Sequence, residues 1–168
     1  MKYLRRLIWY ISSRLLVICC ILALMVTAFY LSMNATNIYV VVKDGMARRA
    51  QVVMMGQEED LTRYFVPAYL ERDEMLDNTL FQDYYSITGF DHRIKLDSFW
   101  CWPWDDTARA TVTERIPAVD GKLRASARDS GLPATPQWQS ARYSVLLSRE
   151  NGRWRIKNMT VSKYLTDE

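Results

Sequence analysis

Glu114 is the acidic residue whose position in the sequence is most unusual. It shares the apolar parity of a predicted strand with Val112 and Ile116, and a carboxylate on such a face is costly to bury unless it is paired or protonated. It could serve as an acid or base in a pocket. The simpler interpretation is a carboxylate at the end of a strand that pairs with Arg109, Arg115 or another arginine.

His92 is the single histidine of the chain and follows Asp91 directly. Adjacent strand residues point to opposite faces, so an Asp-His dyad is not expected, and His92 is interpreted as a turn histidine. Cys101 is the one cysteine outside the apolar stretch described below, and we expect it to be a small buried hydrophobe. The chain therefore lacks the usual ligands of zinc. We predict no metal site, no cofactor and no catalytic set, and no phosphate-binding loop or nucleophile motif is found.

Aromatic residues are concentrated around Trp100, Trp102 and Trp104, which alternate along a predicted strand. Such rings can line a pocket for sugars, quaternary ammonium groups or apolar ligands. Alternating tryptophans on a sheet covered by helices more commonly belong to the core, because each ring buries a large area. The candidate pocket residues are Glu114, Trp100, Trp102, Tyr85 and His92.

Basic residues gather on the last predicted hairpin and form a candidate partner surface: Arg142, Arg149, Arg153 and Arg155. Four of the 22 basic residues precede the apolar stretch, so the remainder is nearly balanced by the 19 acidic residues. A near-neutral domain is a poor nucleic-acid binder, and nucleic acid is not an expected partner.

The stretch from Leu15 to Met33 contains no charged residue and is long enough for a helix that crosses a bilayer. Its flank carries Lys2, Arg5, Arg6 and Arg14, and the positive-inside rule keeps such residues in the cytosol. A retained anchor is favoured over a cleaved signal peptide, whose apolar region is shorter and ends in a small-x-small site. We therefore expect a single-pass protein of the cell membrane with a cytoplasmic N-terminus and an extracytoplasmic C-terminal domain.

Four regions follow from this pattern: a basic tail at 1–14, a transmembrane helix at 15–33, a connector at 34–45 and a domain at 46–168. The connector could be a strand or a continuation of the anchor helix. Met46, Ala50, Val53 and Met54 then form a helical stripe, with Arg48, Arg49 and Gln51 placed elsewhere on the cylinder, and Gly56 ends the helix.

Shorter helical pieces are predicted after Glu58 and at 73–76, with an interruption at Pro67.

In the second half of the domain, apolar and polar residues alternate with period two. Strands are expected around 94–104, 108–116, 141–147 and 154–161, with a short connection at Asp105-Asp106 and a hairpin turn at Asn151-Gly152. A change of parity in the last strand predicts a bulge near Lys157-Asn158. The residues at 122–137 are predicted to form a polar loop that could contact a partner. The fold class is α+β, with about three helices packed on one face of a curved antiparallel sheet.

The order of these elements and the closing pattern of Gly152, Trp154 and Ile156 resemble the nuclear-transport-factor-2-like, cystatin-like superfamily. The resemblance implies a cone-shaped domain whose helices and concave sheet can enclose a pocket. Together with the single span, the chain is similar to scaffold proteins of type IV secretion and conjugation machines, and to small membrane proteins of spore-forming bacteria.

The predicted function is that of a membrane-anchored scaffold or accessory subunit of a bacterial envelope complex, acting by protein-protein interaction. The alternative is a membrane-tethered enzyme or small-ligand-binding domain with an aromatic pocket at Glu114. The expected partners are the lipid bilayer, other membrane or envelope proteins, and further copies of the chain.

Overall fold

A computed structural model describes residues 2–102, 104–128 and 130–166. Its first element is the helix α1, Lys2–Met55, which is 54 residues long and therefore about 80 Å from end to end. Gly56 ends the helix with a φ of 66° and donates its N–H to the carbonyl of Val52 at 3.0 Å, as predicted.

The connector at 34–45 is part of this helix. Ile38 and Val42 are fully buried and lie on the same stripe as Met46, Ala50 and Val53. Five buried apolar residues at helical spacing make a continuous helix more favourable than a strand, because one face can pack against the sheet along its whole length. The packed domain thus includes residues before position 46.

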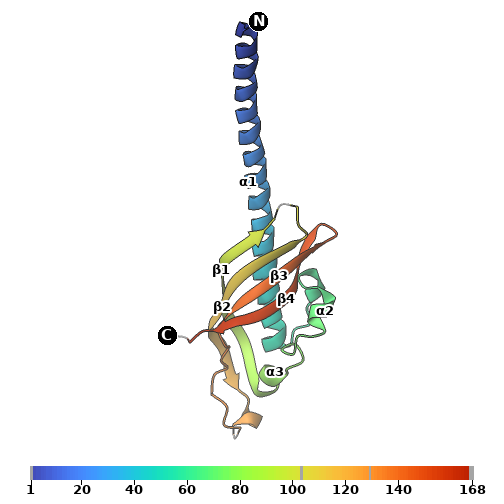
Figure 1. The fold of residues 1–168 in the computed structure, drawn as a ribbon. Coiled ribbons are helices and arrows are strands. Elements are labelled where there is room, and N and C mark those ends of the chain that lie inside the picture. The colour runs from blue at the N-terminus through green and yellow to red at the C-terminus, as the bar shows by residue number, and fades with distance from the viewer. Residues whose placement is uncertain (1, 103, 129, 167–168) are drawn as a thin grey trace.

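The outer part of α1 has different surroundings. Large apolar side chains between positions 15 and 33 are exposed on all sides of the helix, among them Leu16, Ile21, Leu24 and Phe29. Among the described residues, α1 is the one helix long and apolar enough to cross a membrane. Figure 1 shows this part of α1 projecting from the domain.

Four antiparallel strands form one sheet in the order β1-β2-β3-β4. Their bounds are Tyr85–Cys101, Thr107–Leu123, Ala141–Glu150 and Arg153–Tyr164. The turn between β3 and β4 has Asn151 at φ 50° and Gly152 at φ 77°, the left-handed conformations that this type of hairpin turn requires. Both predicted hairpins are confirmed.

Short helical elements fill the connection between α1 and the sheet: η1 Leu61–Arg63, α2 Pro67–Leu70 and α3 Leu80–Tyr84, with η2 Ala125–Ala127 after β2. Asp60 caps η1 by accepting the N–H of Thr62 at 3.0 Å. Pro67 begins α2 instead of only interrupting the chain, since its fixed φ suits the first turn of a helix. Between 122 and 137, the start of the predicted loop is strand and η2.

The lower half of α1 lies against the sheet, and the main core forms between them (Figure 1). Buried side chains from β2 and β3 meet α1 there, including Val112, Val145 and Leu147. The α+β fold class is confirmed.

Bulges decide which residues of the edge strands face this core. In β1, Leu96 pairs with Val112 but Ser98 pairs with Thr111, so Asp97 is an extra residue. One extra residue reverses the parity of everything after it. In β4 the extra residue is Lys157, because Leu147 pairs with Ile156 and Leu146 with Asn158. The predicted bulge in the last strand is confirmed.

Candidate functional site

An open cleft of about 1170 Å³ lies beside the sheet. Its walls come from the end of α1, the segment around α2, and strands β3 and β4; the lining includes Arg49, Tyr69, Asp73, Trp138, Tyr143, Lys157, Met159 and Val161. Apolar and polar groups therefore meet in one concave surface. This is the composition expected of a binding site.

A buried ion pair forms part of the cleft wall. Arg49 donates to Asp73 through two nitrogens, with Nη2 to Oδ1 at 2.7 Å, and the two residues are 4% and 8% exposed. Burial disfavours the charge of Arg49, but the hydrogen bonds and charge of Asp73 outweigh it, so the pKa of Arg49 is raised. Because both groups are bonded to each other, the pair fixes α1 to the segment after α2 and offers no free charge.

Two tyrosines of the cleft have weakly acidic hydroxyls. Burial raises the pKa of Tyr69 to about 12, against the effect of the nearby Arg49 charge. Burial, followed by the negative charge of Glu114, raises the pKa of Tyr143 far above its ordinary value. Tyr69 also stacks on Phe65 with ring centroids 5.4 Å apart. Both hydroxyls are neutral at physiological pH, and the carboxylates of Asp73 beside Tyr69 and of Glu114 beside Tyr143 compete with any bound group for their protons.

Glu114 lies deeper than the cleft and is 1% exposed. Its Oε1 is 2.9 Å from Nε2 of His92, so the predicted pairing with Arg109 or Arg115 is wrong. His92 lies within β1, not in a turn, and the turn interpretation is also wrong. Between the pairs Asp91–Ala118 and Arg93–Arg115, two residues of β2 oppose His92 alone, and this bulge brings the imidazole to the carboxylate.

The bulge at Pro117 could have been expected, since proline cannot donate to a ladder and is tolerated at bulges. His92 has the parity of Ile94, which pairs with Glu114, so the parity of β1 already placed the imidazole on the face of the carboxylate. Oε2 of Glu114 has no hydrogen-bond partner among the described residues. Neither residue of the His92–Glu114 pair lines the cleft, and the pair interacts with the cleft residue Tyr143 through Glu114.

The tryptophans are not in the core, and they do not line the cleft. Trp100, Trp102 and Trp104 are 67%, 53% and 78% exposed, so their assignment to a core or pocket is wrong. The extra residue Asp97 is the cause: after it, Phe99 and Cys101 face inward and the tryptophan positions face outward. Cys101 is buried, as expected for a small hydrophobe.

Tyr85 is buried at the opposite end of β1 from the tryptophans. Its hydroxyl donates to the carbonyl of Pro133 at 3.0 Å. Tyr85 pairs with Leu123, well along the strand from the Ile94–Glu114 pair. It therefore holds the connection after β2 and does not share a site with Glu114.

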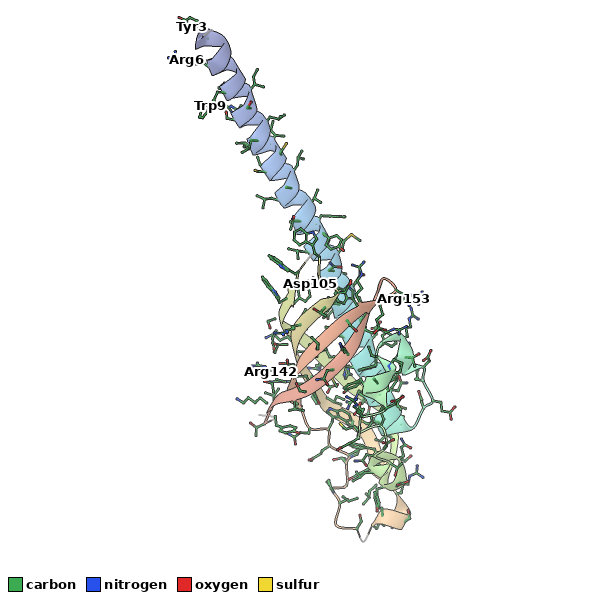
Figure 2. The ribbon with its side chains drawn as sticks, turned by 45° about the vertical axis from the view of Figure 1, so that its right-hand side comes forward. Tyr3, Arg6, Trp9, Asp105, Arg142 and Arg153 are labelled. Carbon is green, nitrogen blue, oxygen red and sulfur yellow. The ribbon has the colours of Figure 1, made fainter. Side chains whose placement is uncertain are left out.

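The four arginines of the last hairpin do not form one patch. Arg142 and Arg153 lie at opposite ends of the sheet (Figure 2). Arg142 contacts Asp97, with Nε to Oδ2 at 3.1 Å, while Arg149 donates to the hydroxyl of Tyr30 at 2.9 Å and Arg155 pairs with Glu150 at 3.4 Å. The Thr113 hydroxyl, with Arg142 acting in the same direction, lowers the pKa of Asp97.

One edge of the sheet is open beside the cleft. The segment at 64–66 pairs with β4 only at Ile156, where the N–H of Val66 donates to the carbonyl of Ile156 at 2.9 Å. Beyond Ile156, no described segment forms a ladder with the outer side of β4. The backbone from Lys157 to Lys163 is thus a free strand edge, and several of its side chains line the cleft.

Sequence reasoning missed Arg49, Asp73, Tyr69 and Tyr143 as cleft residues. Arg49 was placed away from the buried stripe although it lies between Met46 and Val53 at helical spacing, which was the available signal. Tyr69 lies in α2, which has only four residues, and Asp73 lies in the turn that follows, so both elements are too short for a periodic pattern to place them.

Among the described residues, no group of three or more His, Cys, Asp or Glu side chains is arranged to hold a metal ion. No family model, curated protein or solved structure matches this chain.

Proposed function

We propose that this chain is a single-pass membrane protein whose outer domain is a scaffold or accessory subunit of an envelope complex, and that it binds a partner protein at the cleft and the free edge of β4. The observation that carries the proposal is the position of an unpaired strand edge, Lys157 to Lys163, along a cleft of about 1170 Å³.

Membrane anchoring is supported by the exposed apolar surface of α1 between positions 15 and 33. A helix satisfies its own backbone polar groups and can expose such a surface only where lipid replaces water. The basic residues before the stretch favour a cytosolic N-terminus, which places the domain outside the cytosol.

Protein binding is supported by the chemistry of the edge. An extended segment of a partner can add to a free strand through main-chain hydrogen bonds, while neighbouring hollows select its side chains. The cleft offers apolar contacts at Met159 and Val161, together with the rings of Tyr69 and Tyr143. The bulge at Lys157 limits indiscriminate pairing, a common device at edges that must avoid aggregation.

A catalytic function has less support. The ion pair of Arg49 and Asp73 is mutually bonded, and Glu114 is enclosed with its Oε1 bonded to His92. General acid–base catalysis needs a titratable group within reach of the substrate, whereas Arg49 and Asp73 are bonded to each other and Glu114 does not line the cleft.

Photo-crosslinking in native membranes tests the proposed function. A photoreactive amino acid replaces Lys157 or Val161 in separate variants, with Lys95 on β1 as the matched control, since its side chain is also exposed but lies on the opposite edge. We expect both β4 variants, and not the control, to form the same covalent adduct with another protein. Adducts only from position 95, or none from either β4 position, would contradict the proposal. An adduct with a second copy of the chain would identify the partner as itself.

A further inference from the structure

The exposed tryptophans form an ordered cluster at the end of β1. Trp100 and Trp102 stack with ring centroids 5.8 Å apart, and Trp102 and Trp104 meet edge to face at 6.0 Å. At least half of each residue's surface is exposed. Three neighbouring indoles that are exposed to this extent mark a contact with an apolar or interfacial partner.

The sheet topology places this cluster at one particular end of the domain. With antiparallel neighbours in sequence order, the β1–β2 connection and the β3–β4 turn lie at the same end of the sheet. The N–H of Arg149 donates to the carbonyl of Asp106 at 2.7 Å and joins the two. Figure 2 shows Asp105 and Arg153 at the end of the domain from which the outer part of α1 emerges.

A direct contact fixes the level of that end along α1. Arg149 donates to the hydroxyl of Tyr30 at 2.9 Å, and Tyr30 lies one helical turn before the end of the uncharged stretch 15–33. That stretch is about 28 Å long as a helix, close to the thickness of the hydrocarbon layer. A bilayer that accommodates it has its outer surface near Tyr30, level with the loop that carries the tryptophans.

We propose that Trp100, Trp102 and Trp104 insert into the outer headgroup region of the bilayer that α1 crosses and hold the domain in a fixed orientation on the membrane. The proposal rests on the membrane anchoring proposed above. Indole rings favour this region because an apolar ring and a hydrogen-bonding N–H are both accommodated there. The cluster lies at the end of the domain from which the apolar part of α1 emerges, which is why lipid is a better candidate than a separate protein.

The charges of the same end favour a neutral headgroup layer. Asp105, Asp106 and Glu150 are balanced by basic residues such as Arg149 and Arg153. Strong attraction to anionic lipid is therefore not expected, and the contact depends on the indoles.

Quenching of tryptophan emission by brominated lipid tests the proposal on the full chain in phosphatidylcholine vesicles. Trp9 lies near the other end of the apolar stretch, so the parent protein carries Trp9→Phe. A second variant adds Trp100→Phe, Trp102→Phe and Trp104→Phe, and the difference between the two reports the cluster. The buried Trp138 and Trp154 are common to both.

Lipids brominated near the headgroups should quench the emission that the cluster contributes. Lipids brominated deep in the acyl chains should quench it less. As a positional control, Tyr164→Trp is added to the four-substitution variant, since position 164 is exposed at the other end of β4. Its emission should be unaffected by either lipid.

Emission from the cluster that is unchanged by both lipids would overturn the proposal, as would equal quenching of the control at position 164. A second result would also overturn the proposal. The variant Trp102→Cys is made in a background of Cys19→Ala, Cys20→Ala and Cys101→Ala. If it forms a disulfide-linked dimer and the emission of the cluster is unquenched, the tryptophans contact a second copy of the chain. All proteins are first extracted with alkaline carbonate. Release from the vesicles at that step would show failure of the anchor itself, whereas retention with unquenched tryptophans would show failure of this inference alone.

Discussion

The two halves of α1 are one continuous helix in two different surroundings. The outer half exposes apolar side chains in every direction, while the inner half buries the stripe of Ile38, Val42, Met46, Ala50 and Val53 against the sheet. Its inner half also carries a charge, Arg49, inside the packed region. The comparison shows that apolar content alone does not tell whether a helix is stabilised by lipid or by protein; the angular distribution of the apolar residues does.

The largest expected effect concerns the buried charge of the inner half, Arg49. Arg49→Ala leaves the carboxylate of Asp73 buried without a partner, which should lower the free energy of unfolding by about 3–5 kcal/mol. The control Arg48→Ala removes the more exposed ion pair with Glu59 and should cost less than about 1 kcal/mol. Urea unfolding of the full chain in detergent, followed by near-ultraviolet circular dichroism, measures both.

A double substitution sharpens that result. Arg49→Met with Asp73→Leu removes both charges and keeps apolar volume, so it should recover most of the stability that Arg49→Ala loses. If the double variant is as unstable as Arg49→Ala, the ion pair contributes net stability to the fold beyond offsetting the cost of burying its two charges.

An identical substitution in the two halves gives the next effect. Ile38→Ala removes a fully buried side chain and should destabilise the domain by about 3 kcal/mol. Ile21→Ala changes an exposed residue of the apolar stretch, and the unfolding free energy of the domain should stay within about 0.5 kcal/mol of wild type. Equal losses for the two substitutions would mean that the outer half also packs against the domain.

The smallest effect concerns alkaline pH. Burial raises the pKa of Tyr69 to about 12 in the folded protein, above the ordinary tyrosine value of about 10, and it raises the pKa of Tyr143 as well. Above about pH 10 the unfolded state loses the tyrosine proton first, so stability present in full below that pH is lost as pH rises toward 12. The difference in unfolding free energy between wild type and Tyr69→Phe should therefore fall between about pH 10 and pH 12. A constant difference would contradict the shift.

Regular periodicity allowed most of the fold to be predicted. The buried stripe of α1, the helix end at Gly56 and the turn at Asn151-Gly152 each depend on local rules that the structure obeys. The bulge at Lys157 was predictable because apolar residues on both sides of it changed parity.

The same reasoning failed at Asp97 because tryptophan continued the apolar alternation on the wrong face. Ile94 and Leu96 face inward, and the extra residue then turns Trp100 outward. In a soluble context large exposed indoles are unfavourable, so the pattern indicated burial. The partner of Glu114 was missed for a different reason: His92 was taken as a turn residue, although it has the parity of Ile94, which pairs with Glu114.

Cysteine labelling in spheroplasts is the most direct test of the proposal that α1 crosses the membrane and holds the domain outside the cytosol. In a background of Cys19→Ala, Cys20→Ala and Cys101→Ala, a membrane-impermeant maleimide is applied to variants with Tyr164→Cys or Tyr3→Cys, both positions having exposed side chains. The account predicts that position 164 is labelled in intact spheroplasts and position 3 only after permeabilisation. Labelling of position 3 in intact spheroplasts, or of position 164 only after permeabilisation, would contradict it.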